Sequence, residues 1–301
     1  MGSGSIFSCS CAAKDRLSDW TSGETSAPPE GRQDWQNAML SRIQLNEYPA
    51  IKERHHKRIS QYPLINAVIS GIQEGLVYAD SSRNTFFIST KAGFSLFDSL
   101  RPALNFESEL FYFLQHAADI PGYLHIYGPG RSFQDHVAAN WAKHKIRQRA
   151  QFRYLGDGCT TNERLLPPHY RIATIQEVGF VQLEEAFKLD FGNRYWNSTA
   201  DFLTHAIGAC ILNEKSEPAA ICYSACVVEG HAEMDTLVMP EYRGKGFMKI
   251  VSEPFFNLAV RNKLIPHWDT FVSNAASYRA AQRFQLRLVQ EYDLLSLLVR
   301  T

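Results

Sequence analysis

Two glycines and two cations lie together where a predicted strand gives way to a predicted helix. The run Arg243-Gly-Lys-Gly246 follows apolar residues that end at Val238 and precedes the apolar pattern of residues 247–262. At such a junction, main-chain N–H groups and the positive end of a helix dipole attract an anion. Glycines allow a phosphate to approach the main chain, and the two cations add positive charge. The run therefore predicts a site for a phosphorylated ligand, with an ordinary tight turn as the alternative.

Two acidic residues lie upstream in the same strand pattern. Glu233 and Asp235 are two residues apart, so a strand places both side chains on one face. At about 3.3 Å per residue, the strand from Glu233 to Val238 spans roughly 17 Å. A carboxylate can thus stand at one end while phosphates are held at the other. Glu233 is a candidate general base, directly or through a water, and Asp235 is the weaker candidate. The alternative for Glu233 is a carboxylate paired with a neighbouring cation.

The loop and a second motif resemble a known family. Arg243-Gly-Lys-Gly246 after Val238-Met-Pro240 is similar to the acetyl-CoA loop of GCN5-related N-acetyltransferases (GNATs), written Arg/Gln-x-x-Gly-x-Gly/Ala. The second motif is Asn274-Ala-Ala-Ser277, preceded by Pro266-His-Trp-Asp269. Together the motifs resemble the branch that includes zwittermicin A resistance proteins. The resemblance covers about residues 170–301, and further residues that fit it are Trp196, Phe202, Gly208, Ala281, Phe284 and Leu286.

The resemblance implies an α/β fold, in which a GNAT-type mixed sheet is flanked by helices, and acetyl-CoA as co-substrate. The pyrophosphate would lie against the loop, and the pantetheine along the strand that ends at Val238. Asn274 is also a good N-cap for the helix that follows, and both roles can hold at once. The implied cofactor contacts are Leu237, Val238, Arg243, Gly244, Lys245, Gly246, Phe247, Met248, Asn274 and Ser277.

The chain departs from the family pattern at three positions. Met248 stands where the loop has Gly or Ala, so its side chain would narrow the pyrophosphate site, and Gln285 replaces a frequent Gly. Ala281 stands where many relatives have a tyrosine that acts as general acid. Tyr278 and Ser277 are then the candidates for protonating the leaving thiolate. A main-chain N–H near Val238 would polarise the thioester carbonyl.

The reaction that the resemblance implies is direct attack of a primary amine on acetyl-CoA. The expected acceptor is a small molecule, as in antibiotic resistance. A protein amine is the alternative, acetylated by an effector delivered into a host cell, because Cys9 and Cys11 lie in a Ser/Gly-rich leader. A non-catalytic acyl-CoA-binding interaction module is the third reading, favoured by Ala281 and Met248.

The surrounding pattern predicts two α/β units that must position these residues. Residues 1–35 are rich in Ser, Gly, Thr and Pro and predict a disordered leader. Residues 36–155 predict a smaller N-terminal α/β unit that shapes the acceptor pocket, with a degenerate GNAT-like fold as one form of it, and residues 133–154 within it predict a basic helix. A linker at 156–168 leads to the GNAT domain at 169–301.

Composition limits the other classes of function. The 31 Lys and Arg balance the 31 Asp and Glu, which argues against nucleic-acid binding by the basic runs 52–58 and 143–153. No apolar stretch approaches the roughly 18 residues of a membrane span. Six cysteines without a Cys-x-x-Cys pair favour reduced thiols in the cytoplasm over a disulfide scaffold or a metal site.

Overall fold

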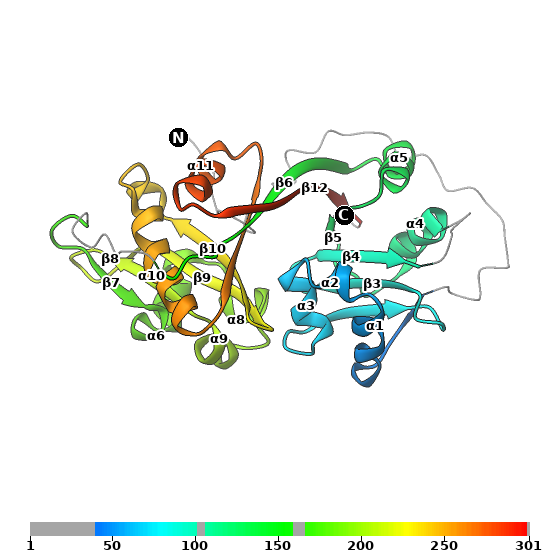
Figure 1. Ribbon diagram of the computed structural model, residues 1–301, viewed down its shortest axis with the longest axis horizontal. Helices are drawn as coiled ribbons and strands as arrows, with labels where there is room; N and C mark the ends of the chain where they lie inside the picture. Colours follow the sequence, from blue (N-terminus) through cyan, green and yellow to red (C-terminus); the bar gives the residue numbers. More distant parts are fainter. Residues whose placement is uncertain (1–39, 101–105, 159–165, 300–301) are drawn as a thin grey trace. The chain divides into compact units, whose positions relative to one another are not determined.

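The computed structural model describes residues 40–100, 106–158 and 166–299, so the predicted leader and the middle of the predicted linker lie outside the described residues (Figure 1). Contacts divide this part of the chain into two units. The C-terminal unit is Gln148–Glu291, and the N-terminal unit consists of the residues up to Arg147 together with those from Tyr292 onward. The chain passes between the units within two strands, β6 (His144–Arg153) and β12 (Arg287–Leu298).

The sheet of the C-terminal unit is mixed. Its strand order is β12-β6-β11-β10-β9-β8-β7, in which β10 and β11 run parallel, while β11 with β6 and the neighbours from β10 to β7 are antiparallel. Glu229 and Gly230 join β9 to β10 with φ of 47° and 77°, the conformation that a tight hairpin turn requires. The strands not yet given are β7 (Arg171–Thr174), β8 (Gly208–Leu212), β9 (Pro218–Val228), β10 (His231–Val238) and β11 (Ile265–Phe271).

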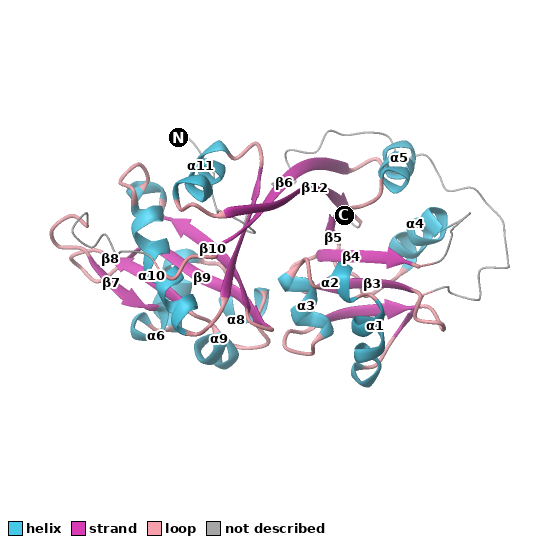
Figure 2. Ribbon diagram, viewed as in Figure 1, coloured by secondary structure: helices cyan, strands magenta, loops and turns pink. Residues whose placement is uncertain are grey.

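Helices flank this sheet (Figure 2). The amphipathic helix α10 (Phe247–Arg261) buries Phe247, Val251 and Phe255 in a core with Met234 and Trp268 of the sheet. Rings of other helices stack on Tyr223 of β9, which points to the opposite face. The remaining helices of the unit are α6 (Ile175–Val178), α7 (Phe180–Phe187), α8 (Phe191–Arg194), α9 (Thr199–His205) and α11 (Ala275–Arg283).

The N-terminal unit is also α/β. Its sheet has the order β1-β2-β3-β4-β5-β12, with β4 and β5 parallel. Aromatic and aliphatic side chains such as Phe87, Leu124 and Leu295 form its core. Its strands are β1 (Ser41–Arg42), β2 (Gly75–Ala79), β3 (Thr85–Thr90), β4 (Phe94–Ser99) and β5 (Tyr123–Tyr127), and its helices are α1 (Tyr48–Arg54), α2 (His56–Ile59), α3 (Pro63–Ile69), α4 (Phe106–His116) and α5 (Arg131–Asn140). The predicted fold class, a GNAT-type mixed sheet with a second α/β unit, is confirmed.

The predicted basic helix at 133–154 is wrong in its second half. Helix α5 ends at Asn140, Trp141 is extended, and β6 follows. Along β6, Ala150 and Phe152 enter the core beside α10, whereas Arg149 and Gln151 point the other way, which is the period-two alternation of a strand.

The units also differ from the predicted ranges. Residues 148–155 pack with the C-terminal unit and residues 292–299 with the N-terminal unit, because β6 and β12 each run from one unit into the other. Among the described residues, none of the helices has both the length and the apolar character needed to cross a bilayer.

Candidate active site

The parallel strands β10 and β11 separate after three residue pairs. Their register is His231–Ile265, Ala232–Pro266 and Glu233–His267, after which β10 keeps its pairing with β9 and β11 keeps its pairing with β6. The β9–β10 register shifts between Glu233 and Met234, so that β9 carries one extra residue, Ala225. A bulge of this kind bends the strands where it occurs. We call the region where residues 234–238 and 268–271 diverge the split.

Hydrogen bonds fix which main-chain groups face the split. Met239 N–H donates to Ala219 C=O of β9, and Ile265 N–H donates to Gly230 C=O. Because main-chain groups alternate in direction along a strand, Thr236 and Val238 direct theirs toward the split, and Leu237 directs its own toward β9. The predicted main-chain contact therefore fits Val238 and does not fit Leu237.

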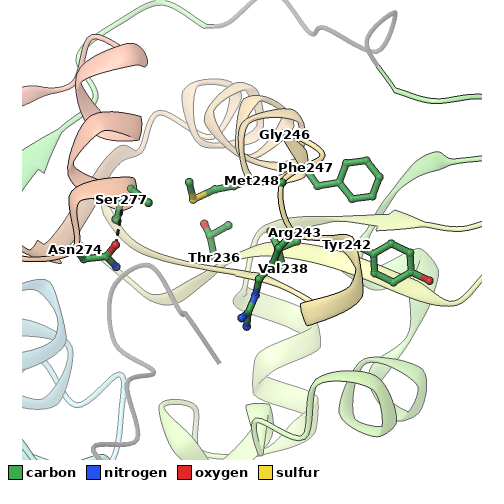
Figure 3. Close-up of a pocket in the computed structure, with 11 residues that line it drawn as sticks. Thr236, Val238, Tyr242, Arg243, Gly246, Phe247, Met248, Asn274 and Ser277 are labelled. Atoms are coloured by element: carbon green, nitrogen blue, oxygen red, sulfur yellow. Dashed lines mark hydrogen bonds between the residues drawn. The ribbon is translucent and has the colours of Figure 1, made fainter. Parts of the chain in front are cut away.

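A cavity of about 380 Å³ lies between the end of β10, the glycine loop and the start of α11 (Figure 3). Of the predicted cofactor contacts, all but Leu237 and Lys245 line it. Lys245 instead places its Nζ 5.1 Å from the centre of the Tyr242 ring. Three lining residues were not predicted, namely Thr236, Tyr242 and Ala276.

The two glycines of the loop adopt conformations that other residues avoid. Gly244 has φ of 78° and Gly246 has φ of 77°, and Gly246 is the N-cap of the 15-residue helix α10. Beyond the Cα of each lies open space with no atom within 4 Å of where a Cβ would stand. The first turn of α10 therefore presents its main-chain N–H groups and its positive dipole end beside the cavity, as anion binding requires.

Met248 lies in the first turn of α10 and lines the cavity. Figure 3 shows its side chain extending toward the side of the cavity on which Ser277 lies. We expect Met248→Ala to tighten acetyl-CoA binding several-fold, because it removes bulk beside the phosphate-binding turn while alanine retains high helix propensity. Calorimetric titration of the variant and the parent protein would measure this. Weaker binding by Met248→Ala would instead show that the thioether contacts the ligand.

The start of α11 supplies the opposite wall. Asn274 Oδ1 accepts the Ser277 N–H at 3.3 Å, so Asn274 is an N-cap as its type predicts. Ser277 Oγ in turn accepts the indole N–H of Trp268 at 3.0 Å. These bonds fix both polar side chains at the cavity wall.

The two candidate acids lie in different places. Ser277 lines the cavity, whereas Tyr278 does not and donates its hydroxyl to Glu291 at 3.2 Å. Desolvation and this carboxylate both raise the pKa of Tyr278. Ala281, at the position of the family's tyrosine, is buried in the core beside α10.

Glu233 and Asp235 share the sheet face opposite α10, since Ala232 and Met234 between and beside them enter the core with that helix. Asp235 accepts the Thr236 N–H at 2.9 Å and the Tyr223 hydroxyl at 3.2 Å, so both of its oxygens hold structure. Glu233 is 3% exposed. Burial raises its pKa well above the ordinary value of 4.5, and the nearby Asp269 and Asp235 raise it further against the opposing effect of Arg149.

Comparison with known proteins gives the family. The family model described as GNAT acetyltransferase matches residues 54–295. The uncharacterized N-acetyltransferase YdfB of Bacillus subtilis (strain 168) is 22% identical over 261 residues, which cover 85% of this chain and 98% of that protein.

Solved structures share the fold. A GCN5-related N-acetyltransferase-like protein from Streptococcus suis has a TM-score of 0.62 at 16% identity, over 82% of this chain and 98% of that chain. A tandem GNAT protein from the clavulanic acid biosynthesis pathway has a TM-score of 0.54 at 12% identity, over 85% and 97%, and its tandem character agrees with the two-unit layout. Because the family model spans well over half of the sequence, the chain belongs to the GNAT acetyltransferase family, a family of acyltransferases.

Proposed function

We propose that the protein transfers an acetyl group from acetyl-CoA to a primary amine by direct attack. The observation that carries this proposal is the cavity at the split, bounded by the glycine loop, the first turn of α10 and the start of α11. A polyphosphate fits the helix start, and an extended chain fits along the open edge of β10.

The residues that would hold acetyl-CoA have distinct parts. Gly244 and Gly246 leave room for the pyrophosphate at the start of α10, with Arg243 supplying charge. The main-chain groups of Thr236 and Val238 face the pantetheine. When bound, acetyl-CoA supplies the acetyl group as a thioester.

Proton transfer is assigned to two groups. Glu233 takes the proton of the attacking amine, directly or through a water, as the N–C bond forms and the C–S bond breaks. Asp235 is the weaker candidate because its oxygens already accept two hydrogen bonds. Ser277, rather than Tyr278, is the group placed to protonate the departing thiolate, and the Val238 N–H faces the region where the thioester carbonyl would lie.

A small-molecule amine is the proposed acceptor, by analogy with the zwittermicin A resistance branch, and the cytoplasm is the proposed location. A protein amine in a host cell is the second candidate. The two are separated by offering small amines and lysine-containing peptides with acetyl-CoA. Preference for peptides would overturn the small-molecule acceptor and leave the acyl transfer itself in place.

The first test is acetyl-CoA binding by calorimetry, together with release of free CoA thiol in the absence and presence of amines. We expect saturable binding and amine-dependent thiol release. Absence of binding at millimolar acetyl-CoA would overturn the proposal. Binding without turnover across both acceptor classes would favour the non-catalytic acyl-CoA-binding module.

A further inference from the structure

One main-chain carbonyl on the β11 side of the split is held by a residue from another strand. Tyr154 N–H of the β6 side donates to Pro266 C=O, which sets the alternation along β11. The main-chain groups of His267 and Asp269 therefore point toward β10, and at Asp269 β10 has already diverged. Arg149 of β6 donates from its Nη2 to Asp269 C=O at 2.8 Å.

The same guanidinium also binds the Asp269 side chain. Its Nε donates to Asp269 Oδ1 at 2.7 Å, and its carbon lies 4.9 Å from the centre of the Phe271 ring. Arg149 is 1% exposed and Asp269 is 2% exposed. A guanidinium fork can satisfy two oxygens of one residue with fixed geometry, which an ammonium cannot do as well. The pair thus fixes both the main chain and the side chain of β11 where the split opens.

This buried pair lies beside Glu233. Burial is the largest cause of the raised pKa of Glu233; Asp269 raises that pKa further and Arg149 lowers it. The titratable and charged groups that share this sheet face with Glu233 come from four strands: Tyr223 on β9, His231 and Asp235 on β10, His267 and Asp269 on β11, and Arg149 and Arg153 on β6.

We propose that Arg149 is a positioning residue of the active site, which holds the β11 edge of the split and balances the buried negative charge beside Glu233. It lies outside both sequence motifs, on a strand that the sequence places in the other unit. The inference rests on the proposed role of Glu233 as the base, and it assigns to β6 a part in the chemistry of β10 and β11.

The test follows the titration of Glu233 directly, without acetyl-CoA or an acceptor. The full chain is labelled with carbon-13 at the glutamate carboxyl carbon, and the Glu233 signal is assigned by its loss in Glu233→Gln. Arg149→Gln should move the titration midpoint of Glu233 to higher pH, because it leaves the Asp269 charge unbalanced. Asp269→Asn should move the midpoint to lower pH, because it removes a neighbouring negative charge. Arg149→Lys, which keeps the charge, should leave the midpoint nearest to that of the parent protein.

Opposite shifts in Arg149→Gln and Asp269→Asn support the inference. A loss of thermal stability in both variants with unmoved midpoints overturns it, since a purely structural pair would behave in that way. Where Arg149→Gln does not fold, Asp269→Asn decides alone: a downward shift supports the inference and an unmoved midpoint overturns it. Turnover of Glu233→Gln separates the two proposals, because full turnover there rejects the base assignment whatever the midpoints do.

Discussion

Replacing Glu233 by glutamine should lower turnover by a factor of about 10² to 10⁴ while acetyl-CoA affinity stays close to that of the parent protein. The amide has nearly the same shape as the carboxyl but cannot accept the proton of the amine. Glu233 also does not line the cavity assigned to acetyl-CoA, so the binding site remains intact. Steady-state kinetics with an active amine and calorimetry with acetyl-CoA measure the two effects separately.

The pH dependence gives the same assignment a second test. Glu233 acts as a base only when ionised, and burial with Asp269 and Asp235 nearby raises its pKa well above 4.5. The kcat/KM of the parent protein should therefore rise with pH along a limb that lies above the ordinary carboxyl range, and this limb should vanish in Glu233→Gln. Glu185→Gln, a change at an exposed glutamate of α7, is the matched control and should keep both turnover and limb. Unchanged turnover in Glu233→Gln would remove Glu233 as the base.

Stability should respond in the opposite sense from activity. The folded-state pKa of Glu233 is raised above its unfolded value, so the associated stabilisation is fully present below the unfolded pKa and is lost as pH rises through the folded pKa. Glu233→Gln carries no such charge. Its Tm relative to the parent protein should therefore increase as pH rises, which thermal melts at acidic and alkaline pH can measure.

The sequence predicts the elements around the loop well because their signals are local. Gly246 and Asn274 each mark a helix start, and α11 begins and ends where predicted. Glu229 and Gly230 mark the turn between β9 and β10. These residues impose or satisfy backbone conformations within a few positions of themselves, so no tertiary information is needed.

The interpretation of 143–153 failed because its deciding contacts are distant in sequence. A run of cations normally predicts a solvated helix face, but Arg149 is buried against Asp269, which is 120 positions away. Only the folded sheet brings these two residues together. The same limit applies to the split itself, since its position depends on a bulge in β9 and on the ends of two strand pairings.

Within the site, the unpredicted residues differ in how far sequence signals reach them. Thr236 is two residues before Val238 and shares its strand face, so alternation alone was enough to include it. Tyr242 depends on the short turn at Pro240–Tyr242, and Ala276 depends on how α11 presents its first turn. Leu237 was included wrongly because the pairing direction of its main chain is not visible in the sequence.

Replacing Gly246 by leucine should weaken acetyl-CoA binding at least about tenfold, which corresponds to roughly 1.4 kcal/mol. The residue has φ of 77°, where a leucine is strained, and the new side chain would project from the N-cap of α10 beside the cavity. It would therefore both distort the main-chain N–H groups and occupy the approach of the pyrophosphate.

Gly179→Leu is the matched control, because Gly179 also has positive φ, of 83°, and open space beyond its Cα, but does not line the cavity. It should share the backbone strain of Gly246→Leu and its loss of Tm, yet bind acetyl-CoA like the parent protein. Calorimetry of both variants, each shown to be folded by thermal melting, separates strain from contact. Equal affinities in the two variants would place the phosphates elsewhere, whereas selective loss in Gly246→Leu ties them to the start of α10, where main-chain donors and the helix dipole act on the same anion.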